Sequence, residues 1–367
     1  MRYEDIFLTG LGAELGQPVG TPWMVRRGAL AVADARRTRQ RAVCVASASG
    51  PELAAAAARQ AIETHQRVAG RSPSIRVHLH ASTYDKPDFW SAACFVLDQL
   101  AVSGCGLVCE IDARSNGMVL GLELAASLLG GRPDLHTALI TGGDRFAGER
   151  FARYRSDHGV LYGDAGAAML LSRTPGLARL VSIATCTDPL LEGLTRDTSA
   201  TTVSRTGTPS APIDVRGRQR SWLAEHGGLA HALRRNQSAV TTTMRMALAD
   251  ADITLEDARW IVLPFLGHEA VRTRWLAPLG IDENRTLTLL GLHLGHLGAA
   301  DHVVGLRHLI ATAAVKPGDH VVLASSGAGM TWTTAVVQIM DAAHALRHRR
   351  PTATRAAPLS RSTVPAA

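Results

Sequence analysis

Ser115 is the residue of this sequence best placed to act as a nucleophile. It lies in the passage VCEIDARSNGMVLGLELAASLL, residues 108–129. The stretch 106–112 predicts a buried strand, and 117–129, apolar on nearly every side, predicts a helix inside the protein. A hydroxyl in the turn between them faces the positive end of the helix on a rigid support, which suits a nucleophile. The alternative is that Ser115 merely caps the helix.

A nucleophilic serine needs a general base, and His296 is the best candidate among the fifteen histidines. It stands between Gly295 and Gly298 in LHLGHLGAADHVVGL, residues 292–306, and Asp301 follows at the start of the next predicted helix. A histidine in a glycine turn can point into a cleft, while a helix N-terminus keeps an aspartate ionised. These residues predict a Ser-His-Asp site. The alternative is that Asp301 caps its helix and the histidine is an ordinary, partly buried residue.

Strand and helix patterns alternate around these residues in both halves of the chain. In the first half the periodicity predicts, in order, helix 51–68, strand 75–80, helix 89–100, strand 106–112, helix 117–129, strand 137–142 and a strand within 160–173. In the second half it predicts helices 238–249, 269–276 and 301–313 and strands 260–264, 320–324 and 331–339. The repeated order predicts a layered α/β protein that arose by duplication.

These elements divide the chain into four parts. Residues 1–175 form an N-terminal half with the nucleophile, and residues 236–342 form a C-terminal half with the His-Asp pair. Residues 176–235 are an inserted loop or cap region, whose polar part from 185 onward is expected to cover the active site. Residues 343–367 are poor in apolar residues and rich in Pro, Ser, Thr and Arg, so we expect a disordered tail.

Composition excludes several classes of protein. The 367 residues are 46% hydrophobic and 19% charged, and no apolar run reaches the ~18 residues of a membrane span or resembles a secretory signal, so we expect a soluble, cytoplasmic protein. The five cysteines show no CxxC spacing, which predicts reduced thiols and no metal site.

The net charge of +7 is spread along the chain with few aromatics, which argues against nucleic acid and favours an acidic partner or a phosphate-bearing ligand. No glycine pattern for a dinucleotide follows any predicted strand.

Four motifs, in order, resemble the β-ketoacyl-acyl-carrier-protein synthase III enzymes of the thiolase superfamily. They are the Ser115 turn with its helix, YGDAGAA at 162–168, the segment 293–301 and SSGAGMTW at 325–332. The resemblance covers about residues 40 to 340. It implies a thiolase-like fold of five αβαβα layers from two duplicated halves, and a homodimer.

The departures from the family pattern concern its catalytic residues. The family's nucleophilic cysteine corresponds to Ser115, its condensing histidine to Phe265, and its asparagine to His296. His268 lies close to the lost histidine in sequence and is expected to be structural. The pattern is similar to a subgroup of antibiotic biosynthesis, which comprises acyltransferases with a Ser/Cys-His-Asp triad and priming ketosynthases that use serine.

The resemblance also implies roles for further residues. Backbone amides of Ser115 and Ala328 would form the oxyanion hole. Phe89 corresponds to an aromatic residue that crosses the dimer interface to close the partner's acyl pocket, and Phe265 is assigned to the acyl pocket as well. For Phe89 the alternative is a plain core aromatic.

We therefore expect an acyltransferase of polyketide-type antibiotic biosynthesis. It would load an acyl group from acyl carrier protein or acyl-CoA onto Ser115 and pass it to a hydroxyl or amine of a small-molecule acceptor, with no cofactor and no metal. Two alternatives stay open. One is a starter-unit priming ketosynthase that condenses a short acyl-CoA with a malonyl carrier protein, and the other is a non-catalytic partner subunit of a ketosynthase.

Overall fold

The structure is a computed structural model that describes residues 1–85, 89–148, 150–196 and 212–346. Within these residues, one hydrogen-bonded sheet of nine strands runs through the molecule. From one edge to the other its strands are β5 (Leu107–Ile111), β4 (Val77–Ala81), β6 (Thr137–Asp144), β7 (Ala165–Ser172), β1 (Phe7–Leu15), β8 (Ala178–Thr187), β11 (Thr331–Ile339), β10 (His320–Gly327) and β9 (Ala258–Val262).

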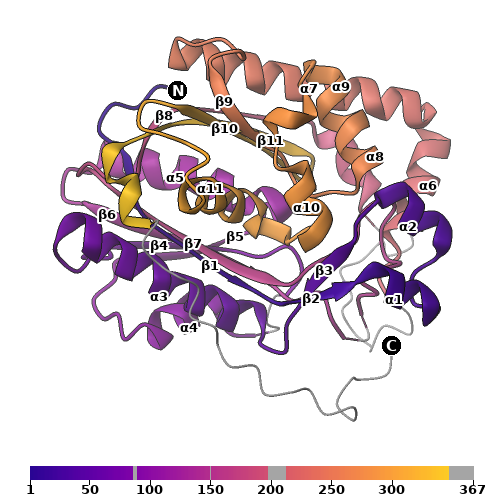
Figure 1. Cartoon of the computed structure of the whole chain (residues 1–367), viewed down its shortest axis with the longest axis horizontal. Helices are drawn as coiled ribbons and strands as arrows, with labels where there is room; N and C mark the ends of the chain where they lie inside the picture. Colours follow the sequence, from indigo (N-terminus) through magenta and orange to yellow (C-terminus); the bar gives the residue numbers. More distant parts are fainter. Residues whose placement is uncertain (86–88, 149, 197–211, 347–367) are drawn as a thin grey trace.

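Two similar halves of this sheet meet at its centre. Strands β4, β5 and β6 are parallel, and β7 and β1 run antiparallel to their neighbours; in the second half β9 and β10 are parallel, and β11 and β8 are antiparallel. The junction between β1 and β8 consists of two residue pairs, Phe7 with Arg179 and Leu8 with Ala178. The two halves of the sheet form two layers, and the short pairing of β1 with β8 joins them (Figure 1).

Helices fill the space between the two halves of the sheet and cover both outer faces (Figure 1). Helices α5 (Gly117–Gly131) and α11 (Asp301–Ala311) lie in the middle, in contact with each other and with strands of both halves. Helices α3 (Gly50–Ala69) and α4 (Ala92–Gln99) cover one outer face, and α7 (Gly228–Ala251) covers the other. The predicted five-layer αβαβα arrangement is confirmed.

Close packing of α3 on the sheet depends on small residues. The helix is rich in alanine, and β1 presents Gly10 and Gly12 to it; a Cβ on Gly12 would lie 1.9 Å from the carbonyl oxygen of Ala57. Ser49 and Glu52 form a capping box at the start of the helix, and Gly70 ends it in a left-handed conformation. Local signals and packing therefore agree on the bounds of this helix.

The central helices account for the apolar sequence around the candidate nucleophile. Met118, Leu122, Ala125 and Leu129 of α5 are fully buried, as expected for a helix in the middle layer. The largest buried cluster joins α5, α11 and the strands on either side. A rigid, dry core thus lies directly behind the turn that carries Ser115.

The structure corrects three predictions about elements. Strand 106–112 is not buried: β5 is an edge strand, and its Leu107 is 43% exposed. The expected loop region at 185–235 contains helix α6 (Val215–Glu225) and the first turns of α7, which starts ten residues before the predicted 238. In the expected tail, residues up to 346 continue a 3-10 helix (Asp341–Leu346), which buries Ala343 and Leu346. Residues 197–211 of the cap and 347–367 of the tail lie outside the described residues, and the boundaries at 175, 235 and 342 stay predictions.

Several elements were not predicted, most of them near the N-terminus. They are β1, β8, β2 (Gln17–Gly20), α1 (Thr21–Arg26), α2 (Val32–Thr38), β3 (Ala42–Val45) and α10 (Thr288–Leu294). The predicted helix 269–276 is split into α8 (His268–Val271), a π-helical turn and α9 (Ala277–Leu279). Among the helices of the described ranges, none is long and apolar enough to cross a membrane.

Candidate active site

Ser115 occupies the turn between β5 and α5 that the sequence predicted. Residues Arg114–Asn116 form a single 3-10 turn, and α5 begins at Gly117. Arg114 has a positive φ of 50°, which places local backbone strain next to the serine. Gly117 permits the close approach of this turn to β4, because a Cβ there would lie 2.6 Å from the Cβ of Ala81. The packing behind the turn fixes the backbone of a half-buried serine.

His296 is fixed by backbone pairing rather than by a helix. It lies between α10 and α11, where its N–H donates to the carbonyl of Leu161 at 2.9 Å and its carbonyl accepts from Gly163 at 2.9 Å. Gly295, with a φ of 80°, allows the chain to approach this segment, since a Cβ there would lie 3.1 Å from the amide nitrogen of Gly163. The histidine is 4% exposed, so its ring orientation is set by the surrounding packing.

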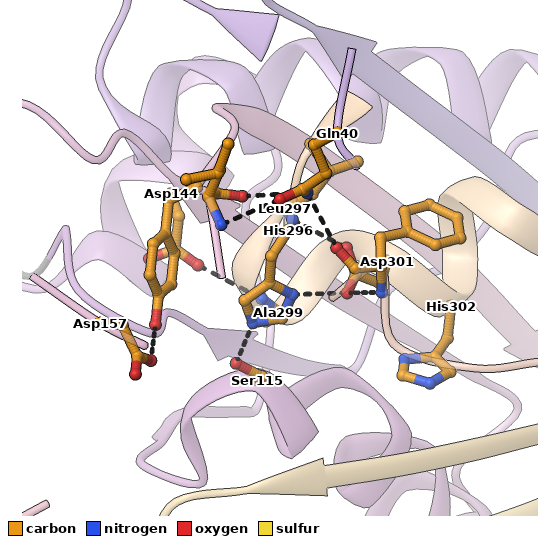
Figure 2. A network of polar contacts seen from close by, with 12 residues as sticks. Gln40, Ser115, Asp144, Asp157, His296, Leu297, Ala299, Asp301 and His302 are labelled. Atoms are coloured by element: carbon orange, nitrogen blue, oxygen red, sulfur yellow. Dashed lines mark hydrogen bonds and ion pairs between the residues drawn. The ribbon is translucent and has the colours of Figure 1, made fainter. Parts of the chain in front are cut away.

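Ser115, His296 and Asp301 form one continuous hydrogen-bonded chain (Figure 2). The serine Oγ lies 2.8 Å from Nε2 of the imidazole, and Nδ1 lies 2.6 Å from Oδ2 of the aspartate. Because the carboxylate accepts the Nδ1 proton, Nε2 is left as the acceptor for the serine hydroxyl. The three residues predicted from separate passages of the sequence therefore meet in the arrangement of a nucleophile, a base and a group that orients the base.

Asp301 is positioned by backbone N–H groups as well as by the imidazole. Its Oδ1 accepts from Leu297 at 2.8 Å and its Oδ2 accepts from Phe265 at 2.8 Å, and the side chain is fully buried. Both N–H donors fix the orientation of the carboxyl group toward the imidazole. A helix cap alone, the alternative reading of Asp301, does not describe these contacts.

The electrostatics of the site favour a basic imidazole. Burial lowers the pKa of His296, but the charge of Asp301 and its hydrogen bond outweigh burial, so that the pKa lies above the usual value of an imidazole. Two further carboxylates, Asp144 and Asp157, act in the same direction. The ring of Tyr162 packs on the imidazole with a centroid separation of 5.4 Å, and its hydroxyl donates to Asp157 at 2.7 Å.

Two residues that the sequence analysis missed hold the segments of the triad together. Gln40 is buried; its Oε1 accepts from the N–H of Leu161, and its Nε2 donates to the carbonyls of Leu161 and Phe265. It thereby joins the segment that pairs with His296 to the segment that bonds Asp301. Asp144, at the end of β6, accepts hydrogen bonds from five donors. The signal at Asp144 is an acidic residue directly after the predicted apolar strand 137–142; no pattern marks Gln40.

The predicted oxyanion residue Ala328 lies in the turn after β10, next to the Ser115 turn. A Cβ on Gly327 would lie 2.0 Å from the carbonyl oxygen of Ala113 and 2.9 Å from the Cβ of Asn116. Asn116 also donates to the Thr333 hydroxyl at 2.9 Å, which links the start of α5 to β11. The turn that carries Ala328 is therefore packed against the nucleophile turn.

The two predicted acyl-pocket residues lie in different surroundings. Phe265 is 2% exposed and belongs to the main core cluster, where its ring packs on Gly291 and Gly305 of α10 and α11. Its backbone N–H donates to Asp301, and its ring packs in the hydrophobic core. Phe89 is fully exposed, so the alternative of a core aromatic is wrong for this residue. His268 begins α8 and pairs with Glu283 at 3.4 Å, a structural contact as expected.

Metal ligands do not gather anywhere in the described part of the chain. No group of three or more His, Cys, Asp or Glu side chains there has an arrangement that could hold a metal ion. The carboxylates around the triad are instead satisfied by N–H and O–H donors.

Comparison with known proteins extends this description. The family 3-oxoacyl-acyl-carrier-protein synthase III matches residues 109–189, and the C-terminal family of the same enzymes matches residues 248–339. Among curated proteins, β-ketoacyl-acyl-carrier-protein synthase III of Rhizorhabdus wittichii is 27% identical over 329 residues, which are 89% of this chain and 93% of that protein. The enzyme of the same name from Nitratidesulfovibrio vulgaris is 28% identical over 310 residues, 82% of this chain and 86% of that protein.

Solved structures show the same relationship. ChlB3, described as an acyltransferase, has a TM-score of 0.84 and 29% identity and covers 93% of this chain and 99% of its own. Synthase III of Pseudomonas aeruginosa has a TM-score of 0.73 and 19% identity, covering 92% and 99%. OleA of Xanthomonas campestris has a TM-score of 0.70 and 17% identity, covering 92% and 98%. The protein therefore has a thiolase-like α/β fold. Within that class the chain is similar to β-ketoacyl-acyl-carrier-protein synthase III enzymes in sequence and to the acyltransferase ChlB3 in structure.

Proposed function

We propose that this protein is an acyltransferase that carries its acyl group as an ester on Ser115. The observation that carries the proposal is the unbroken chain from the serine hydroxyl through His296 to the buried carboxylate of Asp301. Serine is a weak nucleophile at its free pKa, and this chain supplies the base that activates it. A raised pKa on the buried imidazole strengthens that base.

The first half-reaction loads the serine. Oγ of Ser115 attacks the carbonyl carbon of an acyl thioester while its proton passes to Nε2 of His296, and Asp301 stabilises the resulting imidazolium. Collapse of the tetrahedral intermediate breaks the carbon–sulfur bond, and the imidazolium returns the proton to the departing thiol. Backbone N–H groups of Ser115 and Ala328 are proposed as donors to the oxyanion, a role for which one donor is typically worth ~3–4 kcal/mol.

The second half-reaction transfers the acyl group to an acceptor. A hydroxyl or amine gives its proton to Nε2 of His296 as it attacks the ester carbonyl, and the proton then returns to Oγ of Ser115 as the ester bond breaks. The same imidazole therefore serves both half-reactions. No cofactor or metal takes part in this scheme.

The donor, the setting and the assembly belong to the same proposal. An acyl carrier protein or acyl-CoA donor is supported by the names of the related synthases, and by a net charge of +7 that attracts an acidic partner. A role in polyketide-type antibiotic biosynthesis is supported by the triad and by the similarity to ChlB3. A homodimer is supported by the exposed edge strand β5 and by the fully exposed Phe89, which suits a residue that enters a partner's acyl pocket. A cytoplasmic location rests on five free cysteines.

The alternative of a priming ketosynthase is favoured by the relatives, which are named as synthases. Against it stands position 265, where the family's second catalytic histidine is replaced by a buried phenylalanine. Loss of that donor removes one of two groups that would hold a developing enolate. A non-catalytic partner subunit has no need of an oriented base, so the intact triad opposes this reading.

The loading step can be tested by intact-protein mass spectrometry after incubation with a set of acyl-CoAs and acyl carrier proteins. The wild type should gain the mass of the acyl group and Ser115→Ala should not, whereas Ser127→Ala, on the same helix, should behave as the wild type. Ser115→Cys should still be acylated, because a thiolate is the better nucleophile. A label that mapped to Cys94 or Cys109 would show that the serine assignment is wrong.

The transfer step separates the two enzymatic readings. Acyl-enzyme is offered a malonyl carrier protein in one arm and a panel of hydroxylated and amino small molecules in the other. We expect slow carbon dioxide release in the first arm and an ester or amide product in the second. Rapid, acyl-dependent carbon dioxide release with a 3-ketoacyl product would establish the priming ketosynthase instead.

A further inference from the structure

Asp144 is a buried carboxylate at the point where the two halves of the active site meet. It is the last residue of β6, it is fully buried, and it makes no ion pair among the described residues. Its two oxygens accept from five donors: the hydroxyl of Ser82 and the backbone N–H groups of Thr83, Tyr84, Asp85 and Ala299. Burial raises the pKa of Asp144, and its hydrogen bonds act in the opposite direction. Backbone N–H groups can only donate, so this set of partners favours the ionised carboxylate against the effect of burial.

One group of donors leads to the nucleophile. Residues 82–85 follow β4, and the Ser82 hydroxyl and the N–H of Tyr84 lie 2.9 and 2.7 Å from Oδ1 of Asp144. The carbonyl of Thr83 in turn accepts from the guanidinium of Arg114 at 3.0 Å. Arg114 is the residue before Ser115 and has the positive φ of the nucleophile turn. Asp144 thereby anchors the loop on which that turn rests.

The remaining donor leads to the base. Ala299 donates to Oδ2 of Asp144 at 3.3 Å from the short 3-10 turn between His296 and Asp301 (Figure 2). Gly298 in the same turn has a φ of 62°, and a Cβ there would lie 2.2 Å from that oxygen. A glycine is therefore required to bring the turn down onto the carboxylate.

We propose that Asp144 is a positioning residue that holds the Ser115 turn and the His296–Asp301 turn in register. Its negative charge also favours the protonated form of His296. The inference rests on the proposed acyl transfer at Ser115. It extends the triad by a residue that touches none of its three side chains.

The titratable groups around His296 determine how the loss of the Asp144 charge would change the titration of the imidazole. The groups that face the imidazole are Asp301 and His302 from α11, Asp144 from β6, Asp157 and Tyr162 from the segment before β7, and Ser115. Of these, Asp301, Asp144 and Asp157 favour the protonated imidazole. Replacing Asp144 by a neutral residue should therefore let His296 lose its proton at lower pH.

The decisive variant is Asp144→Asn, which keeps the size of the side chain but removes the charge and one acceptor. We expect Ser115 to be acylated about 10- to 100-fold more slowly, since a small misplacement of reacting groups costs rate on this order. The acidic limb of the rate against pH should move to lower pH. The same direction should be seen in the titration of His296 by NMR of labelled histidine, with the resonance assigned by its absence in His296→Gln.

The matched control is Asp164→Asn. Asp164 is also fully buried and accepts backbone N–H groups, but it is paired with Arg153 at 2.8 Å and has no contact with residues 298–300. This variant should lower stability and leave the titration of His296 unchanged. A milder variant, Ser82→Ala, removes one donor and no charge, and should slow acylation roughly two- to fivefold at an unchanged pH midpoint.

The outcomes separate this inference from the proposed function. If Asp144→Asn folds as the wild type and shows the wild-type rate and pH dependence, the inference is overturned. If Asp144→Asn does not fold, Ser82→Ala decides, and a wild-type rate in that variant overturns it. If the wild type is never acylated at Ser115, the proposed function fails, and an unchanged His296 titration in a folded Asp144→Asn then overturns the charge effect independently.

Discussion

Asp301→Asn is the substitution that tests the triad most sharply. In the wild type, Oδ2 accepts both the Nδ1 proton of His296 and the N–H of Phe265, and Oδ1 accepts the N–H of Leu297. An asparagine must place its NH2 group where either Oδ1 or Oδ2 lies in the wild type. At both positions the neighbouring groups are hydrogen-bond donors, so the NH2 group finds no acceptor there. With the NH2 group at the imidazole, Nδ1 becomes the acceptor and the proton moves to Nε2, which can then no longer take the proton of Ser115.

The expected magnitude follows from the lost contact. A buried, charge-assisted hydrogen bond to an imidazolium contributes about 3–4 kcal/mol, because removing one partner of a buried pair leaves the other uncompensated. At 1.36 kcal/mol per factor of ten, the acyl-transfer rate should fall by about 10²–10³. His296→Ala removes the base itself and should cost on the order of 10³ or more.

The assay is the rate of Ser115 acylation by stopped incubation and mass spectrometry, from pH 5 to pH 9, with circular dichroism to confirm folding. Asp301 raises the pKa of His296. In the variant, the acidic limb of the acylation rate against pH should therefore lie at lower pH than in the wild type. A folded Asp301→Asn enzyme within threefold of the wild-type rate would refute the reasoning. Such a result would mean that Asp301 only caps α11.

Three further predictions concern stability, each measured by urea unfolding. Burial lowers the pKa of His78 to about 3, so the neutral ring is accommodated in the fold at no cost above about pH 6.5, and the free energy of unfolding falls as the pH drops below 6.5. Between pH 7 and pH 5 the wild type should therefore lose about 2 kcal/mol more of its free energy of unfolding than His78→Gln. An equal loss in both would exclude this role. Arg153→Met should cost about 3–5 kcal/mol because it leaves Asp164 buried without a counter-charge, and adding Asp164→Asn should restore part of the loss. Gly12→Ala should cost more than about 2 kcal/mol, since its Cβ would lie 1.9 Å from the carbonyl oxygen of Ala57, and unchanged stability would contradict the tight packing of α3 on β1.

The candidate site could be predicted from the sequence wherever local rules applied. Ser115 follows a strand and precedes an apolar helix, and His296 and Asp301 are separated by a glycine turn and a helix start. Short-range periodicity and turn residues determine such elements, so strand, turn and helix were correctly placed around Ser115. Around His296 and Asp301 the turn and the start of α11 were predicted, but α10 was not. The order of motifs then indicated the family and with it the duplicated five-layer fold.

Local patterns did not reveal exposure or long-range partners. The apolar strand at 106–112 resembles a buried one, but β5 lies at the edge of the sheet, where three of its five residues are exposed. Phe265 was expected in the acyl pocket, whereas its ring packs between α10 and α11 and its backbone N–H bonds Asp301. Which neighbour a side chain meets depends on elements that are tens to hundreds of residues away in the sequence, and periodicity carries no information about them.

The amino-acid sequence by itself determined the type of each candidate catalytic group and the short segment that presents it. Only the tertiary structure decided that these groups meet, because Ser115 and His296 are 181 residues apart and their 2.8 Å contact exists only when the two halves close on the central helices. The same holds for Asp144, whose donors come from two distant turns. Burial of these polar groups is favourable only if every donor finds an acceptor, and that condition is met by the packed fold as a whole rather than by any one segment.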